Sequence, residues 1–263
     1  EYISDLKHAL TKKHEPYERI GLRKGDKHNQ INDSIIQIEN EYSSSIRPKR
    51  DVQSGQRPIT VLKNEGIAYI EVRCLDNNPF LRGSIDRHTA YFIEAYLMVS
   101  LIDENYPFDE NRIKEIQDNW QNTVRKGRDP NLLLKRDGKT ISVKDAAEEV
   151  FSKIYDYAYA LPIEADDLKK KILRSLDIQK AKLRNSDLTP SGMILKEMEE
   201  KNVTWNEFCN NRAEINNRYY EMLKKDTTNI KISAEASLQE FQNLESSKEV
   251  DFDTFLKDYL DAI

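Results

Sequence analysis

The hydrophobic period of this sequence changes at about residue 86, and this change limits the folds that the chain can adopt. Before it, strand signals predominate. They are the β-branched residues Ile35, Ile36 and Ile38, an extended stretch over residues 46–50 around Pro48, and an alternating stretch over residues 67–75. A short helix is predicted over residues 58–65, ending at Gly66, because glycine tolerates a positive φ.

From residue 86 onward, apolar residues recur with the period of a helix. One apolar stripe contains Tyr91, Ala95, Met98 and Ile102, and the next contains Ile113, Ile116, Trp120 and Val124. Further helices are predicted over residues 143–160, 165–184, 191–201, 204–225, 234–244 and 252–263, with a hairpin turn at Asp137-Gly138. The sequence therefore predicts an α+β fold, in which a strand-rich part (1–85) is followed by a mainly helical part (86–263) that packs on it.

Composition narrows the classes of partner and compartment. The formal charge of −5 comes from 46 acidic and 41 basic residues without a long basic block, so no nucleic-acid partner is expected. The longest apolar run, residues 90–102, contains Glu94 and is shorter than the roughly 20 residues of a membrane span. Two cysteines, Cys74 and Cys209, are too few for a disulfide framework, which indicates a cytoplasmic protein. The sequence begins at Glu1 without an initiator methionine, as expected of a fragment.

The strand predicted over residues 67–75 has two different faces. Alternation places Ala68, Ile70, Val72 and Cys74 on one apolar face, which we expect to pack on helices. The opposite face presents Tyr69, Glu71 and Arg73. The simplest interpretation of these polar residues is a solvated sheet surface, on which Glu71 and Arg73 pair with neighbours across the strands.

A functional interpretation rests on the other two strand signals. Gln37, Glu39 and Glu41 would share one face of the first strand, and Arg47 and Lys49 share a face around Pro48. Paired with aligned faces, these strands would form a floor of carboxylates and cations suited to Mg²⁺ and phosphate. The sequence contains no glycine-rich phosphate loop, so a metal ion and side chains would have to hold the phosphate.

Several motifs resemble the proteobacterial type of glutamate–cysteine ligase. They are Ile-Glu-Asn-Glu at 38–41, Ile-Arg-Pro-Lys-Arg at 46–50, and Tyr-Ile-Glu-Val-Arg-Cys-Leu-Asp-Asn-Asn-Pro-Phe at 69–80. Gly-Arg-Asp-Pro at 127–130 and Asp-Leu-Thr-Pro-Ser at 187–191 extend the resemblance. It covers this whole chain but only the C-terminal half of such an enzyme.

The resemblance implies a glutamine-synthetase-like ligase core, built on an antiparallel sheet that binds ATP and several Mg²⁺ ions. In that family ATP phosphorylates the side-chain carboxylate of L-glutamate, and the amine of L-cysteine then attacks the acyl phosphate. The product is γ-glutamylcysteine, formed in the first step of glutathione synthesis. The N-terminal half of the enzyme would be the partner that completes the site, so this chain alone is expected to be inactive.

The resemblance also implies roles for single residues. Glu71 would bind Mg²⁺, and Arg73 would bind the nucleotide and stabilise the γ-phosphoryl group during transfer. The softer assignments are Lys49 to the nucleotide, Glu39 and Glu41 to metal, and Asn40, Tyr42 and Arg47 to substrate. Tyr42 is displaced by one position from the tyrosine of the family pattern.

Two alternatives stay open at this point. One is a non-catalytic helical interaction module, which predicts that Glu39, Glu71 and Arg73 are scattered over an open surface. The other is a different carboxylate–amine ligase of the same superfamily.

Overall fold

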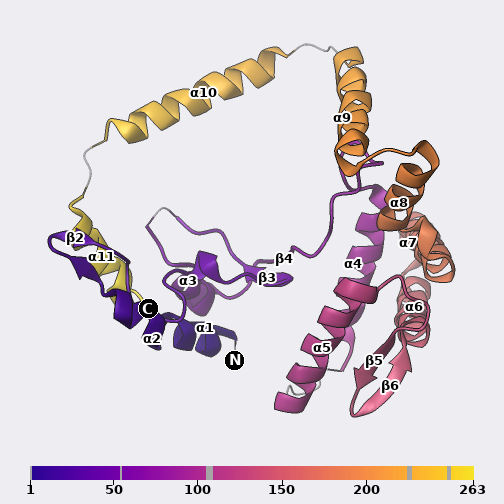
Figure 1. The fold of residues 1–263 in the computed structure, drawn as a ribbon, viewed down its shortest axis with the longest axis horizontal. Helices are drawn as coiled ribbons and strands as arrows, with labels where there is room; N and C mark the ends of the chain where they lie inside the picture. Colours follow the sequence, from indigo (N-terminus) through magenta and orange to yellow (C-terminus); the bar gives the residue numbers. More distant parts are fainter. Residues whose placement is uncertain (1, 54, 105–108, 224–226, 248–249) are drawn as a thin grey trace. The chain divides into compact units, whose positions relative to one another are not determined.

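The chain divides into two compact units in the computed structural model, which describes residues 2–53, 55–104, 109–223, 227–247 and 250–263 (Figure 1). Unit 1 comprises Glu1–Asp76 together with Asp226–Ile263, and unit 2 comprises Asn77–Lys225. The division therefore falls nine residues before the boundary predicted at residue 85. The two C-terminal helices belong to the same unit as the strand-rich part, not to the helical part. Contacts between segments that are far apart in the sequence, such as Ile263 with the core of unit 1, place them there.

Unit 1 contains short helices and two small antiparallel ladders. Its elements are α1 (Tyr2–Thr11), α2 (Glu15–Ile20), β1 (Arg23–Lys24), β2 (Lys27–His28), the 3₁₀ turn η1 (Glu39–Glu41), β3 (Ile46–Lys49), α3 (Pro58–Glu65), β4 (Tyr69–Val72), α10 (Thr228–Glu245) and α11 (Phe252–Asp261). β1 pairs with β2, and β3 pairs with β4. The small core joins α1 and α3 through Leu6, Leu10 and Ile59, and Ile36 and Ile263 pack against it.

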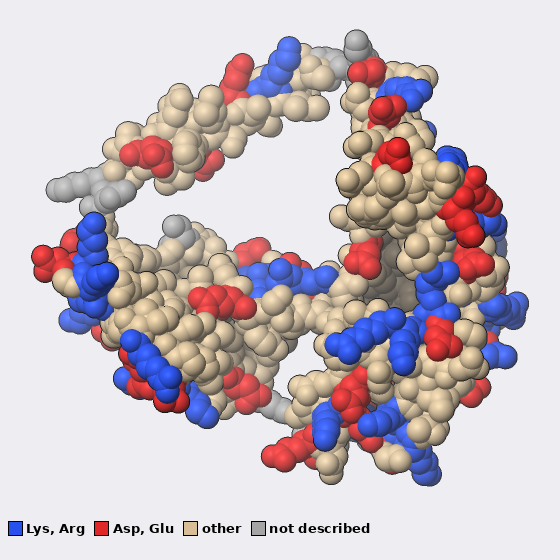
Figure 2. Space-filling model, viewed as in Figure 1, with Lys and Arg blue, Asp and Glu red and all other residues tan. Residues whose placement is uncertain are grey.

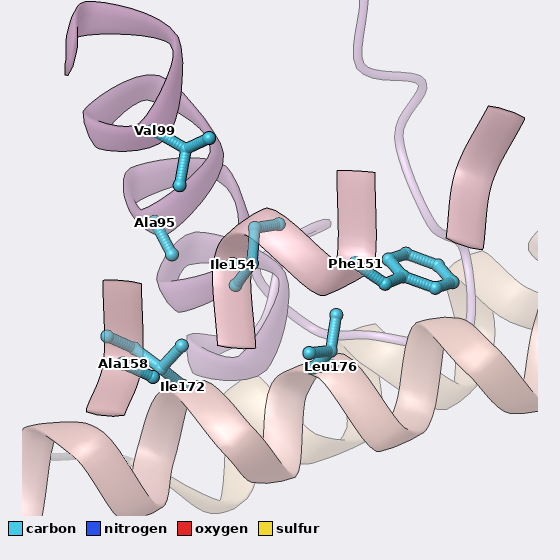
Figure 3. Packing of buried hydrophobic residues seen from close by; sticks show 7 residues of the cluster. All are labelled: Ala95, Val99, Phe151, Ile154, Ala158, Ile172 and Leu176. Atoms are coloured by element: carbon cyan, nitrogen blue, oxygen red, sulfur yellow. The ribbon is translucent and has the colours of Figure 1, made fainter. Parts of the chain in front are cut away.

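Unit 2 is mainly helical. Its elements are α4 (Arg87–Ile102), α5 (Glu110–Lys126), the hairpin β5 (Leu133–Arg136) and β6 (Lys139–Ser142), α6 (Val143–Ala160), η2 (Ile163–Ala165), α7 (Asp166–Arg184), η3 (Ser186–Leu188), α8 (Pro190–Lys201) and α9 (Trp205–Met222). Figure 3 shows the core between α4, α6 and α7, in which Ile154 and Leu176 are completely buried. These helices pack because each carries an apolar stripe with the helical period.

Most of the predicted helices are confirmed. α6 occupies the predicted residues, Asp137 and Gly138 form the hairpin turn with positive φ, and α3 ends at Gly66, whose φ is 77°. α9 has the predicted capping box at Thr204 and Glu207. The last two residues predicted for this helix, 224 and 225, lie outside the described residues. α10 begins six residues before the predicted start.

The strand predicted at Ile35, Ile36 and Ile38 is wrong. Residues 35–38 are irregular, and Glu39 to Glu41 form the turn η1. Side chains take the backbone hydrogen bonds that a ladder would need: Gln37 N donates to Glu41 Oε2 (3.0 Å), and Ile31 N donates to Gln37 Oε1 (3.0 Å). Such local side-chain bonds compete with strand pairing, so Gln37, Glu39 and Glu41 do not share a strand face.

The expected burial of the apolar face of β4 is also wrong. Ile70 is 50% exposed, and Ala68 and Cys74 are exposed as well. A ladder of two short strands is too narrow to be buried on both faces. The apolar face is therefore open in this chain.

Two further features concern the surface and the helices. On the face drawn in Figure 2, basic and acidic side chains are interspersed.

Among the described residues, none of the helices combines the length and hydropathy needed to span a membrane.

Candidate functional site

The polar residues of β3 and β4 lie on one face of an antiparallel ladder. Arg47 pairs with Glu71, and Lys49 pairs with Tyr69, whereas the apolar pairs are Ile46 with Val72 and Pro48 with Ile70. Directly opposed residues project to the same side of a sheet. The predicted division of the strand into a polar and an apolar face is confirmed by this register.

Glu71 lies between two cations on this face. Its carboxylate is 3.8 Å from Lys49 Nζ and 3.9 Å from Arg73 Nε, and each of the three side chains is about two-fifths exposed. These distances exceed the length of a hydrogen bond, so the ion pairs are loose. The carboxylate and both cations therefore remain accessible to a metal ion or a phosphate group.

Arg47 is held differently from these residues. The residue is only 8% exposed, its Nη2 donates to Asn40 O (3.5 Å), and its guanidinium lies 5.8 Å from the centre of the Tyr42 ring. Its Nε is buried and has no partner among the described residues. A buried guanidinium with an unused donor is suited to a carboxylate or another anion.

A small cavity of about 50 Å³ lies beside Arg47. It is lined by α1, η1, β3 and α3, and includes Tyr2, Asn40, Arg47 and Lys49. Burial raises the pKa of Tyr2, and the neighbouring Tyr42 contributes in the same direction while Arg47 opposes it. Tyr2 thus adds a hydroxyl that is protonated at neutral pH to a basic cavity, and no sequence motif marked this residue.

Glu39, which was predicted to bind metal, lies in a buried ion pair. Arg57 donates from Nε and Nη2 to its two oxygens, each at 3.0 Å, and the Tyr259 hydroxyl donates to Oε2 at 3.2 Å. Both carboxylate oxygens are therefore engaged. The sequence did not indicate these partners, because Arg57 is 18 positions and Tyr259 is 220 positions away from Glu39 along the chain.

The remaining predicted residues occupy the rim of the site. Asn40 is exposed, Tyr42 is 41% exposed, and Glu41 is an exposed residue that accepts the hydrogen bond from Gln37 N. Within the part of the chain that the structure describes, no group of three or more His, Cys, Asp or Glu residues could hold a metal ion. Glu39, Glu41 and Glu71 are thus not gathered into one cluster.

Two larger hollows lie in unit 2, with volumes of about 740 and 620 Å³. They are open clefts along α5, the β5–β6 hairpin and α6. Charged groups that line them pair with one another. Lys153 pairs with Asp103 and Arg136 with Glu149 in the smaller hollow, and Lys135 pairs with Asp118 in the larger one. Because those charges are already compensated, the β3–β4 face is the stronger candidate site.

The two resembling motifs of unit 2 meet in space. Arg128, from the Gly-Arg-Asp-Pro motif, donates to Asp187 Oδ1 at 3.0 Å, and Asp187 begins the second motif. Thr189 of that motif caps α8 by accepting a hydrogen bond from Gly192 N (3.1 Å). These contacts indicate that both motifs stabilise the turn between α7 and α8.

Comparison with known proteins identifies the family that this chain resembles. Residues 1–123 match the family model described as glutamate–cysteine ligase. Over these residues, which are just under half of the chain, it is similar to this family of ligases. Over 266 residues it is 34% identical to the glutamate–cysteine ligase of Pseudomonas fluorescens, and over 261 residues it is 33% identical to that of a Janthinobacterium species.

The matches also define which part of a relative this chain corresponds to. The two relatives are matched over 100% and 98% of this chain but over only 49% of their own length. A crystal structure of the Francisella tularensis enzyme in complex with AMP is similar, with a TM-score of 0.85, 30% identity, and coverage of 99% of this chain and 52% of that one. The chain therefore spans about half the length of the relatives that it matches.

Proposed function

We propose that this chain supplies the C-terminal part of the active site of an ATP- and Mg²⁺-dependent glutamate–cysteine ligase. The observation that carries the proposal is the accessible carboxylate Glu71, flanked by Lys49 and Arg73 on the polar face of the β3–β4 ladder. Similarity to this family and the AMP complex of the Francisella relative support a nucleotide-dependent reaction. We place the protein in the cytoplasm, because its two cysteines are too few for a disulfide framework.

In the proposed reaction, an oxygen of the glutamate side-chain carboxylate attacks the γ-phosphorus of ATP, and ADP leaves. The cysteine amine then attacks the acyl carbon, and phosphate leaves as the amide bond forms and the nitrogen releases a proton to solvent. In the first step negative charge develops on the leaving oxygen of ADP, and in the second it develops on the acyl oxygen and then on the departing phosphate. The chemistry therefore needs cations that are fixed in place beforehand.

Each charged residue of the polar face has a role in this proposal. Glu71 is the Mg²⁺ ligand, because a loosely paired carboxylate can exchange its cations for a metal ion. Bound Mg²⁺ would neutralise the phosphate oxygens of ATP. The planar fork of Arg73 contacts the γ-phosphoryl group, and Lys49 contacts the nucleotide phosphates as a point charge.

Arg47, Asn40 and Tyr42 form the proposed amino-acid side of the site. The unused Nε donor of Arg47 is suited to a substrate carboxylate, and Tyr42 covers its guanidinium. Glu41 is the second proposed metal ligand, since it lies at the exposed end of η1. Glu39 stays a proposed ligand only if it first releases Arg57 and Tyr259, so we assign it a structural role in the state described here.

The N-terminal half of such an enzyme is the proposed partner. The exposed apolar face of β3 and β4 includes Ile46 (46% exposed) and Ile70 (50% exposed), and the relatives have twice the length of this chain. Additional strands and side chains from that half would cover the apolar face. They would also supply the remaining metal ligands of a glutamine-synthetase-like sheet.

Substitution of Glu71 tests the proposal in the complete protein that carries this chain. We expect Glu71→Ala to lower the Mg²⁺-dependent release of ADP, measured with glutamate and cysteine, by at least roughly 100-fold, as when one preorganised electrostatic group is removed. Arg73→Lys should also lose much of the activity, because its bidentate contact becomes a point charge.

Glu65→Ala is the matched control, since Glu65 is an exposed carboxylate whose partner is Arg50, at 3.5 Å. This variant should retain normal turnover. Near-normal activity of a folded Glu71→Ala protein would contradict the assignment of Glu71.

A further inference from the structure

We propose that the C-terminal helix α11 positions the amino-acid side of the site through Tyr259 and Arg57. This inference rests on the proposed function, because it deals with how Asn40, Tyr42 and Arg47 are held. Neither Arg57 nor Tyr259 touches the reacting groups in this proposal, so both are positioning residues. α11 lies outside residues 1–123, which the family model matches.

The contact between α11 and η1 is made by a buried guanidinium. Arg57 is 1% exposed and holds Glu39 with two hydrogen bonds of 3.0 Å. The remaining guanidinium nitrogen, Nη1, donates to the carbonyl oxygen of Tyr259 at 3.1 Å. The guanidinium also lies 4.2 Å from the centre of the Tyr259 ring. The Tyr259 hydroxyl then donates to Glu39. Arg57, Glu39 and Tyr259 therefore form a closed network of three, which we call the clamp.

The clamp is connected to Arg47 by a short path along η1. Glu39 begins this turn, and its carbonyl oxygen accepts a hydrogen bond from Tyr42 N at 3.2 Å. The carbonyl oxygen of Asn40 accepts the bond from Arg47 Nη2, while the Tyr42 ring lies over the same guanidinium. A displacement of Glu39 would therefore move two of the groups that hold Arg47.

Burial makes the clamp sensitive to small changes. Removing one partner of a buried ion pair leaves the other charge without compensation, which costs more than the loss of an exposed pair. Burial also raises the pKa of Tyr259, and the negative charge of Glu39 adds to this effect while Arg57 opposes it. The hydroxyl thus remains a hydrogen-bond donor throughout the neutral pH range.

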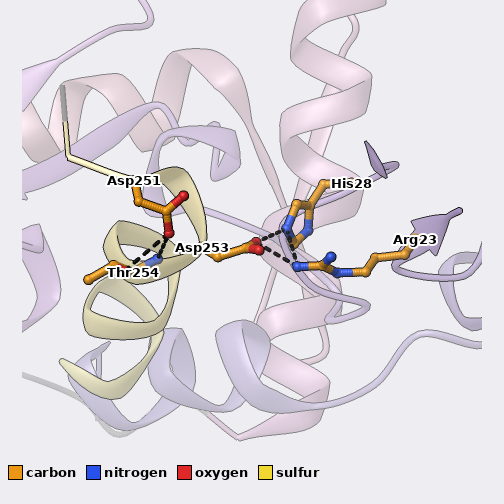
Figure 4. Close-up of polar contacts among 5 residues, drawn as sticks. All are labelled: Arg23, His28, Asp251, Asp253 and Thr254. Carbon is orange, nitrogen blue, oxygen red and sulfur yellow. Dashed lines mark hydrogen bonds and ion pairs between the residues drawn. The ribbon is translucent and has the colours of Figure 1, made fainter. Parts of the chain in front are cut away.

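Other contacts fix α11 independently of the clamp. Lys7 Nζ donates at 3.3 Å to the main-chain oxygen of Ile263, two residues beyond the end of the helix, and Asp253 binds Arg23 and His28 near the start of the helix (Figure 4). The loss of the Tyr259 hydroxyl should therefore loosen η1 without detaching the helix. This separation makes Tyr259→Phe a selective probe.

The test compares Tyr259→Phe with Asp253→Asn in the complete protein. Hydrogen exchange of the backbone amides in residues 39–42 reports on η1, and the KM for each amino-acid substrate reports on the site. For Tyr259→Phe we expect exchange to accelerate about fivefold, the equivalent of one ordinary hydrogen bond. The KM of the substrate that Arg47 contacts should rise by a similar factor, while kcat stays within about twofold. Asp253→Asn should change neither quantity, because its contacts lie away from Glu39.

Two results would overturn the inference. The first is that Tyr259→Phe leaves hydrogen exchange in residues 39–42 unchanged. The second is that Tyr259→Phe accelerates this exchange but changes no KM, while Arg47→Gln does raise a KM. Arg47→Gln also separates the inference from the proposed function. If this variant leaves every KM unchanged, the substrate role of Arg47 is refuted, whereas the exchange measurement still decides whether the clamp holds η1.

Discussion

Gly192 occupies a position in unit 2 where the backbone of another segment comes very close. An added Cβ would lie 2.5 Å from Ser186 O and 2.6 Å from Asp187 Cα, well inside normal contact distances. This approach lets η3 fold back on the first turn of α8, where Thr189 caps the helix. Asp187 can occupy its position, and accept the hydrogen bond from Arg128, because Gly192 has no side chain.

At this residue, sterics and helix propensity predict opposite effects of alanine. Propensity alone would favour Gly192→Ala by about 1 kcal/mol. We expect instead a decrease of about 1–3 kcal/mol in the free energy of unfolding, because the new methyl group must displace backbone. Urea denaturation measures the difference. Gly83→Ala is the control, since its Cβ would meet only Ile85 O at 3.8 Å; a stabilised Gly192→Ala protein would contradict this argument.

Glu71 and Arg73 illustrate how far single residues can be interpreted from the sequence. Their common face followed from the two-residue period of a strand, and the distance of 3.9 Å between the Glu71 carboxylate and Arg73 Nε agrees with it. Their catalytic roles stay predictions, since those roles rest on resemblance. Glu39 gave an equally strong signal, yet it lies in the clamp. No local pattern distinguishes a carboxylate that faces solvent from one that pairs with a distant arginine.

At the scale of elements, α11 and the β1–β2 hairpin are joined by one charged cluster. Asp253 of α11 binds both Arg23 and His28 of the hairpin (Figure 4). Two hydrogen bonds hold the pKa of Asp253 below its usual value of 3.8. The bond from Arg23 has the larger effect, and the bond with His28 has the next largest. A carboxyl group whose pKa is lower in the folded than in the unfolded state stabilises the fold above the unfolded value.

This stabilisation is therefore present at neutral pH and is lost as the pH falls from about 4 through the lower pKa of the folded state. We expect Asp253→Asn to remove part of the acid dependence of stability in that range. Thermal melts between pH 7 and pH 2 measure it. Asp258→Asn removes a charge from the same helix without changing this cluster, and it should keep the acid dependence of the parent protein. Identical acid profiles for the parent and Asp253→Asn would contradict the prediction.

Prediction of elements succeeded where a segment carries an apolar stripe with the helical period, even where this chain leaves the stripe exposed. The predicted stripe of α5, from Ile113 to Val124, is exposed, and so are Met98 and Ile102 of the stripe predicted for α4. α4, α6 and α7 carry such stripes, and they form the core of unit 2. It failed at residues 35–38, where β-branched residues predicted a strand. There, hydrogen bonds between the backbone and the side chains of Asn32, Gln37 and Glu41 decide the conformation. The strand propensity of the three isoleucines affects the backbone conformation less than these hydrogen bonds do.

At the scale of the whole molecule, this chain represents about half the length of the relatives that it matches. Its β3–β4 face holds one accessible carboxylate between two cations, and the clamp engages a second carboxylate. Phosphoryl transfer between a nucleotide and a carboxylate needs a more complete set of ligands. The proposed function therefore requires residues beyond the 263 described by this sequence.

We expect the isolated chain of 263 residues to show no ligase activity. Co-expression with the N-terminal half of a relative such as the Pseudomonas fluorescens enzyme should restore ADP release that depends on glutamate and cysteine. The same mixture with Glu71→Ala in this chain should stay inactive, which controls for activity of the added half. Turnover by the isolated chain would refute the prediction.

The sequence by itself determined the helices, the faces of β4 and the resemblance to a family of ligases. These features depend on periodicity and on short motifs, which neighbouring residues determine together. Only the tertiary structure decided that residues 226–263 join unit 1 and that Arg57 and Tyr259 engage Glu39. The physical reason is that a buried ion pair is stable only when both charges and their hydrogen bonds meet. In the clamp, that meeting depends on packing between residues about 200 positions apart.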